Sequence, residues 1–82
     1  MNEIKFEILK RFGTISASRH GWRTELNLVS WNGNKPKVDI RQWSEDYERM
    51  TKGITFTQQE IERLYVILTE ALVDQSWQKD TI

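Results

Sequence analysis

A run of cations and aromatics marks the middle of the chain as the segment best suited to chemistry. It reads Lys-Pro-Lys-Val-Asp-Ile-Arg-Gln-Trp from Lys35 to Trp43, and Lys-Gly-Ile-Thr follows from Lys52 to Thr55. Ammonium and guanidinium groups bind phosphates, and indole rings accept nucleobases on their faces. Such a surface can hold a nucleic acid strand by its backbone and stack its bases without reading their order.

The faces of the predicted strands separate these residues from the apolar ones, because successive side chains of a strand point to opposite sides. One face is predicted to carry the cations and aromatics, namely Arg23, Trp31, Lys37, Arg41 and Trp43. The other is predicted to carry Leu26, Leu28, Val38 and Ile40, covered by a helix. Large aromatics on a solvated sheet face require an explanation, and unpaired bases supply one. Duplex fits less well, since its stacked bases cannot reach Trp31 or Trp43.

The elements that position these residues change type at Gly53. Alternating segments before it predict strands at Ile4 to Ser16 with a bulge at Gly13, at Trp22 to Trp31 and at Lys37 to Trp43, with a short fourth strand at Ile54 to Phe56. Connections are expected at Ser18 to Gly21, at the hairpin turn Asn32-Gly33-Asn34 and at the polar stretch Ser44 to Thr51.

A helix is predicted to follow, because Thr57-Gln58-Gln59-Glu60 forms a capping box. Its apolar residues recur at helical spacing to about Gln75 or Trp77. This stripe is wider than a small four-stranded sheet needs, so part of it is expected to meet a second copy of the helix. The predicted dimer interface comprises Leu64, Ile67, Leu68, Ala71 and Leu72. In the alternative interpretation, Ile67 and Ala71 are simply exposed.

Length and composition agree with a small binding module. The 82 residues contain no cysteine, so we expect one domain over residues 1–82 with a marginal core, supported by oligomerisation rather than by disulfides. No signal-peptide pattern and no apolar run of about 20 residues is present. The expected location is the cytoplasm, with the nucleoid rather than a membrane as the site of action.

The zero net charge conceals an uneven distribution. Residues 1–53 contain ten Lys or Arg against seven Asp or Glu, a balance of +3, and residues 54–82 contain two against five, a balance of −3. The strands are therefore basic and the helical part acidic. A polyanion is expected to bind the strands.

Catalytic chemistry finds little support in the sequence. His20 is the single histidine, and the carboxylates Glu45, Asp46 and Glu48 stand in a connection without a partner base or metal ligands. No catalytic residue, no metal and no cofactor is predicted.

Taken together, these motifs resemble the PC4 family of the transcriptional coactivator p15 and small bacterial relatives of the YdbC type. The resemblance rests on Val-Ser-Trp-Asn-Gly from Val29 to Gly33, on the Lys35 to Trp43 run and on Lys-Gly-Ile-Thr before the capped helix. Lys5-Phe6-Glu7-Ile8 and the segment from Gly21 to Asn27 resemble the bacterial branch in particular. The fold class implied is α+β, a curved four-stranded antiparallel sheet followed by one C-terminal helix (β-β-β-β-α).

The resemblance also implies a homodimer made largely through the helices and sequence-tolerant binding of single-stranded DNA, in transcription, replication or repair. It implies phosphate contacts at Arg41 and Lys52, a basic hairpin at Lys35 and Lys37, and aromatic contacts at Trp31 and Trp43. Arg19 and Arg23 are expected to be peripheral phosphate contacts.

Alternatives remain for the residues and for the function. Arg41 could instead pair with Asp39 or Glu25, Lys52 could be an ordinary turn lysine, and the two indoles could pack at a dimer seam. RNA could bind the same face, since stacking and phosphate contact do not require deoxyribose. The chain could also be a dimeric protein-interaction module.

Overall fold

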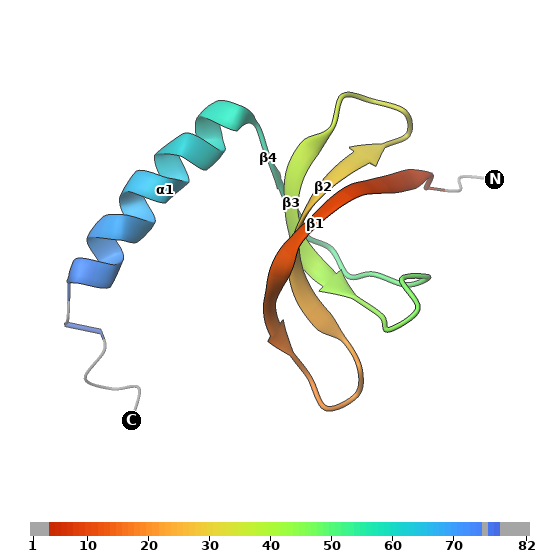
Figure 1. Cartoon of the computed structure of the whole chain (residues 1–82), viewed down its shortest axis with the longest axis horizontal. Coiled ribbons are helices and arrows are strands. Elements are labelled where there is room, and N and C mark those ends of the chain that lie inside the picture. Colours follow the sequence, from red (N-terminus) through yellow and green to blue (C-terminus); the bar gives the residue numbers. More distant parts are fainter. Residues whose placement is uncertain (1–3, 75, 78–82) are drawn as a thin grey trace.

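Four strands and one helix make up the fold in the computed structural model, which describes residues 4–74 and 76–77 (Figure 1). The elements are β1 (Phe6–Ala17), β2 (Arg23–Trp31), β3 (Lys37–Trp43), β4 (Ile54–Phe56) and α1 (Gln58–Val73). The strands form one antiparallel sheet in the order β1-β2-β3-β4. The predicted α+β class and element order are confirmed.

The hairpin turn between β2 and β3 brings these two strands into antiparallel pairing. Asn32 and Gly33 both have positive φ, 53° and 75°, as a two-residue hairpin turn requires. The amide of Asn34 donates to the carbonyl of Trp31 at 2.9 Å and closes the turn. The predicted turn is confirmed. The register between the two strands places Glu25 opposite Arg41.

Strand β1 departs from the simple alternation that its sequence suggests. Its pairing with β2 shifts register three times, between Ile8 and Lys10, between Arg11 and Gly13, and between Thr14 and Ser16. The prediction placed one bulge, at Gly13, and missed the other two. It also began the strand at Ile4, which is wrong because Lys5 lies beyond the end of β2, hydrogen bonded to the turn residue Asn32. Each bulge bends the strand and increases its twist.

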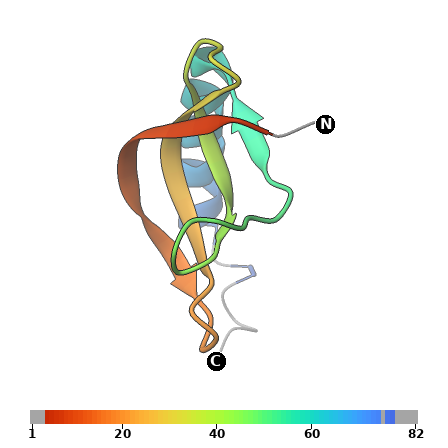
Figure 2. The same ribbon diagram turned by 90° about the vertical axis from the view of Figure 1, so that its right-hand side faces the viewer.

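The resulting curvature decides which side of the sheet is the interior. Val29 and Trp43 are 0% exposed, and Glu25, Asn27 and Asp39 are also buried. All five belong to the face predicted to be open, which we call the concave face. Figure 2 shows β1 and the loop before β4 crossing this face, with α1 behind the sheet. The concave face is therefore largely the core of the chain.

The opposite, convex face carries the apolar residues that were expected to form the main core. Leu26 lies opposite Ile40 and Leu28 opposite Val38, as the alternation predicted. All four are only half-buried, so the prediction that a helix covers them is wrong for most of the face. Helix α1 contacts only β3 and β4 within the described residues, and it points away from the sheet (Figure 1).

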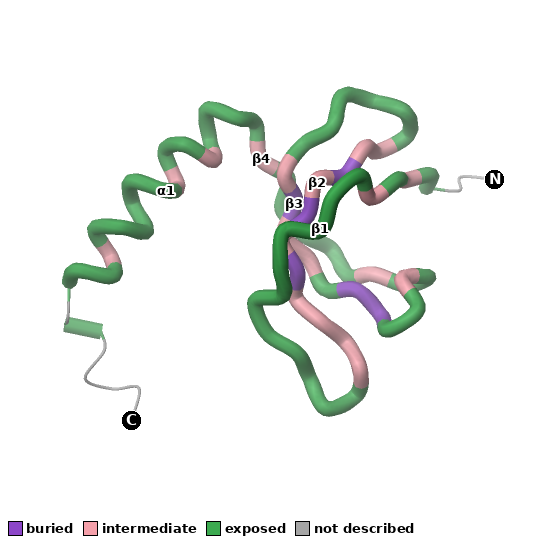
Figure 3. Tube along the Cα trace, in the orientation of Figure 1, coloured by how far each residue is buried: buried purple, intermediate pink, exposed green. Residues whose placement is uncertain are grey.

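Helix α1 begins as predicted but ends earlier. The Thr57 hydroxyl accepts from the Glu60 amide at 3.2 Å, and the Glu60 carboxylate accepts from the Thr57 amide at 2.8 Å. The helix stops at Val73, so an end at Trp77 is wrong, and Gln75 lies outside the described residues. No residue of α1 is buried, and Figure 3 shows its surface largely exposed.

Candidate nucleic-acid interface

Four of the predicted contact residues line one hollow at the hairpin end of the concave face. This hairpin hollow has a volume of about 310 Å³. Its lining consists of Trp31, Asn34, Lys35, Lys37, Arg41 and Thr55. Lys35 and Lys37 are exposed, whereas Trp31 and Arg41 are half-buried. The hollow thus combines two accessible ammonium groups with an indole and a guanidinium group on its wall.

Inside the hollow, the guanidinium group of Arg41 lies over the indole of Trp31, with its Cζ atom 4.3 Å from the ring centre. Its Nε and Nη2 atoms donate to the two oxygens of Asp39 at 2.8 and 2.7 Å. Asp39 is 0% exposed. The pairing with Asp39, one of the two alternatives for Arg41, is therefore present.

The remaining donors of Arg41 are also largely engaged. Its Nη1 atom donates to the carbonyl of Thr51 at 3.3 Å and to the sulfur of Met50 at 3.7 Å. A guanidinium group has five N–H donors, so four have partners within the chain. What Arg41 presents to the hollow is thus mainly a flat, positively charged surface rather than a free fork for a phosphate.

Lys52 is held near this group by the glycine that follows it. A Cβ atom on Gly53 would overlap the Cβ of Arg41 and the carbonyl oxygen of Ile40, so only glycine allows the chain to pass so close to β3. Lys52 itself is exposed. The Lys-Gly-Ile sequence therefore has a steric cause, and it places an ammonium group one residue beyond the Thr51 carbonyl that holds Arg41.

Trp43 does not belong to the accessible surface. Its ring lies 6.3 Å from that of Trp31 and nearly parallel to it, at 10°. Phe6 and Tyr47 pack against Trp43 at 5.1 and 5.9 Å. Because Trp43 is 0% exposed, neither face of its indole can receive a base. The predicted stacking role is wrong for this residue, and the cause is the curvature that turns its face inward.

The far end of the concave face is closed by Tyr47, which has a positive φ of 62°. Its hydroxyl donates to the Glu25 carboxylate at 2.7 Å, and the guanidinium groups of Arg11 and Arg23 lie 4.3 and 5.1 Å from its ring centre. Arg23 also donates to Glu25 at 2.9 Å. Arg23 is therefore bound within the chain, and Arg19 stands exposed in the loop after β1.

Glu25 remains ionised in this setting. Burial alone raises the pKa of its carboxyl group, but hydrogen bonds from Tyr47, Asn27 and Arg23 outweigh this effect, so its pKa lies below the ordinary value.

Three buried polar atoms of the described residues have no hydrogen-bond partner: Asn27 Oδ1, Trp31 Nε1 and Trp43 Nε1.

The structure thus divides the predicted contact residues into three sets. Trp31, Lys35, Lys37 and Arg41 meet at the hairpin hollow, with Lys52 close to Arg41. Arg19 and Arg23 lie towards the other end of β2, and Trp43 is inside. Sequence reasoning missed Asn34 and Thr55 as lining residues and Tyr47 as the closing residue. The alternation of side chains along the strands could have identified Thr55, which pairs with Asp39. No sequence pattern near Tyr47 indicates that its side chain closes the far end of the concave face.

Among residues 4–74 and 76–77, no cluster of three or more His, Asp or Glu side chains could hold a metal ion. In the same part of the chain, no helix has both the length and the apolar content needed to cross a bilayer.

Comparison with known proteins identifies the family. The sequence profile of the family Transcriptional Coactivator p15 (PC4) matches residues 18–67, more than half of the chain. The chain belongs to the PC4 family. The members of this family are nucleic-acid-binding, non-enzymatic factors, which agrees with a surface of cations and aromatics.

A relative with a similar length has also been found. An uncharacterized protein of Treponema pallidum (strain Nichols) is 41% identical over 73 residues, which cover 89% of this chain and 86% of the relative. Its alignment is longer than the match to the PC4 profile, which begins at residue 18, after β1. The similarity to this relative therefore includes residues of the chain that the PC4 profile does not match.

Proposed function

We propose that the chain binds single-stranded DNA with little sequence preference at the hairpin hollow, as a homodimer of the bacterial YdbC-like branch acting in the cytoplasm at the nucleoid. The observation that carries the proposal is the stack of Arg41 on Trp31, 4.3 Å apart, beside two exposed lysines. Membership of a nucleic-acid-binding family supports it.

The two kinds of contact are made by different residues. Lys35, Lys37 and Lys52 are exposed and hold phosphates, because an ammonium group on a flexible stem needs no fixed geometry. Arg41 and Trp31 act together as a stacking surface for a base. The guanidinium plane stacks on the base, since its N–H donors are turned towards Asp39 and Thr51.

Unpaired strands fit this surface better than duplex. Stacking on the Arg41 guanidinium or the Trp31 ring requires a base whose face is free, and duplex bases are stacked on one another. Neither contact reads hydrogen-bonding groups at a base edge, so sequence has little influence. The expected role is in transcription, replication or repair, where such strands are exposed.

Homodimerisation is supported by the apolar surface that a single chain leaves open. Ile67, Leu68 and Leu72 are 46%, 51% and 64% exposed, and Tyr65 on the same side of α1 and Val66 and Val73 on another side are exposed as well. An apolar stripe this wide on a helix is normally packed against another element. A second copy of α1, lying between this helix and the convex face, would cover both.

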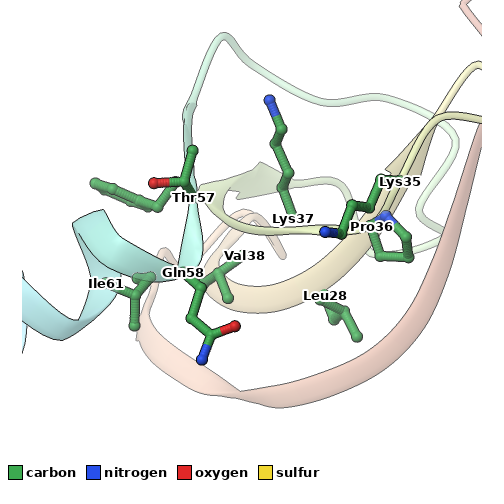
Figure 4. A pocket seen from close by; sticks show the side chains of 9 residues that line it. Leu28, Lys35, Pro36, Lys37, Val38, Thr57, Gln58 and Ile61 are labelled. Atoms are coloured by element: carbon green, nitrogen blue, oxygen red, sulfur yellow. The ribbon is translucent and has the colours of Figure 1, made fainter.

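An apolar cavity at the junction of helix and sheet supports the proposed packing of a second copy. The cavity measures about 360 Å³. Figure 4 shows Leu28, Val38 and Ile61 around it, from β2, β3 and α1. The half-buried convex face continues from this cavity along β2 and β3. Leu64 and Ala71 are already half-buried on α1 and complete the predicted dimer interface with Ile67, Leu68 and Leu72.

Charge-neutral lysine variants test the DNA site. Lys35→Gln and Lys37→Gln should each weaken binding of oligo(dT) and reduce the slope of log K against log[salt] by about 0.7, the value for one phosphate contact on a single strand. Arg63→Gln is the matched control, since it removes one charge from exposed α1. An equal loss of DNA affinity in all three variants would show that binding depends only on net charge, and would contradict a site at the hairpin hollow.

Light scattering tests the dimer. The expected mass is twice the chain mass of 9.8 kDa. Leu68→Glu should give monomers, because it places a charge in the proposed interface, whereas the control Glu70→Lys changes an exposed polar position of the same helix. A monomeric wild-type protein would contradict the dimer without affecting the DNA site.

A further inference from the structure

The opposite end of β2 carries a second pair of an arginine and a tryptophan that the proposed function leaves unused. Trp22 directly precedes the strand and is half-buried. The Cζ atom of Arg49 lies over its indole, 5.7 Å from the ring centre. The combination repeats that of Arg41 and Trp31 at the hairpin hollow, where the distance is 4.3 Å.

Two shallow hollows of about 400 and 450 Å³ adjoin this indole and share Trp22 and His20. The first is also lined by Ser18, Gln42 and Thr51, and the second by Ser44, Glu45, Asp46 and Arg49. Trp22 is therefore reachable from solvent on two sides.

The charges around Trp22 indicate which part of a nucleotide would enter. The hydrogen bonds from the Glu48 amide and the Ser44 hydroxyl lower the pKa of Asp46, which stays anionic. A carboxylate at the rim repels phosphate, so the base rather than the backbone faces this side. The cations Arg19 and Arg49 are both exposed in the neighbouring loops and can hold the adjoining phosphates.

A continuous segment joins the two arginine–tryptophan pairs. Arg49 lies over Trp22, Thr51 lines the first hollow, the Thr51 carbonyl accepts from Arg41, and the exposed Lys52 follows. The pairing partner of Arg41 is Glu25, three residues along the chain from Trp22. That separation along the sheet is roughly 10 Å at the usual strand rise, or about three stacked nucleotides, and the passage around the sheet edge to the opposite face adds to it. A strand leaving Arg41 past Lys52 therefore reaches Trp22 within a few nucleotides.

We propose that Trp22 and Arg49 form a second stacking position, which takes an unpaired nucleobase of a strand already bound at the hairpin hollow. The inference rests on the proposed function and extends it from one contact point to a path around the edge of the sheet at residues 49–52. Trp22 lies on the convex side of the sheet, because it is an odd number of residues from Trp31.

Oligonucleotide length separates the two positions. Oligo(dT) of about 6 and about 12 nucleotides, both within the range of single-strand sites, would be titrated against the wild type, Trp22→Ala, Arg49→Ala and Trp22→Phe. Trp22→Ala should bind the longer strand about five- to 150-fold more weakly, the loss expected for one base stack. It should bind the shorter strand like the wild type, and Trp22→Phe should restore most of the loss. Trp77→Ala, which removes another exposed indole, is the control and should change neither affinity.

The outcomes distinguish this proposal from the function on which it depends. If the wild type binds neither strand, the proposed function fails and the second position fails with it. If the wild type binds both strands and Trp22→Ala and Arg49→Ala alter neither, or weaken both equally, the second position is wrong and the hairpin hollow stands. Thermal unfolding and dimer mass would be measured on each variant. If a variant that loses affinity for both strands is also less stable or no longer dimeric, its loss of affinity comes from damage to the fold, and Trp22 is a structural residue.

Discussion

Removal of the Arg41 side chain is the perturbation with the largest expected effect on stability. Arg41 is 13% exposed and Asp39 0% exposed, and two hydrogen bonds of 2.8 and 2.7 Å join them. Arg41→Ala would leave a carboxylate buried beneath the hairpin hollow without its counterion. The cost of an unpaired buried charge arises from lost solvation, so the sheet itself is expected to weaken.

The magnitude follows from the burial of the pair. Breaking a buried ion pair by removing one partner costs about 3–5 kcal/mol. A chain of this length has a total stability of roughly 4–12 kcal/mol, so Arg41→Ala removes a large part of it. The double variant Asp39→Asn/Arg41→Gln leaves no charge and loses mainly hydrogen bonds, at about 1–2 kcal/mol. It should therefore be more stable than the single variant by roughly 2 kcal/mol.

Urea unfolding at one fixed protein concentration measures these differences, because the stability of a dimer depends on concentration. Far-UV circular dichroism near 222 nm is a suitable signal, since it reports mainly the backbone and less the indoles near Arg41 than tryptophan fluorescence does. A loss below about 1 kcal/mol for Arg41→Ala would mean that the pair is screened by solvent like a surface ion pair. That result, or a double variant less stable than the single one, would refute the reasoning.

Three further changes test other parts of the structure. Gly53→Ala should lower the melting temperature and weaken DNA binding together, because its methyl group would push the chain away from Arg41 and Ile40; an unchanged melting temperature would contradict the close approach. Thr57→Ala should destabilise the protein by about 0.5–2 kcal/mol in urea unfolding through loss of the helix cap, whereas Gln59→Ala, at the neighbouring exposed position, should not. Glu25→Gln should reduce stability at neutral pH. The pKa of Glu25 in the folded protein is lowered from 4.5, so the stability that its carboxylate contributes is fully present above pH 4.5. This stability is lost as the pH falls through the lower pKa of the folded state. The difference between wild type and Glu25→Gln should therefore shrink from pH 6 to pH 3, and a constant difference would count against this role of the carboxylate.

The local signals in the sequence predicted the element order, the hairpin turn and the helix cap, because each depends on residues close together in the chain. Asn32-Gly33 supports positive φ, and Thr57 and Glu60 satisfy each other's amides across three residues. The alternation also placed Leu26, Leu28, Val38 and Ile40 on one face correctly.

What the sequence could not predict depends on curvature. Three bulges in β1, of which only the one near Gly13 had a recognisable signal, bend the sheet so that the face of Trp43 becomes the interior. The more polar of the two faces thereby becomes the interior, while the apolar residues of the other face stay half-buried. The hairpin hollow remained accessible because Lys35 and Lys37 lie at the end of the sheet, where the curvature does not enclose them.

Competition between strands tests the central claim most directly. A labelled oligo(dT) bound to the wild-type protein would be challenged with unlabelled single-stranded DNA, with RNA of the same length and with the matching duplex. We predict that single-stranded DNA displaces the label at much lower concentration than duplex does, and that added salt weakens the complex because counterions are released. Equal displacement by duplex, or no complex even at low salt, would contradict binding of unpaired DNA at the hairpin hollow. Stronger displacement by RNA would indicate that the same surface binds RNA in preference to DNA.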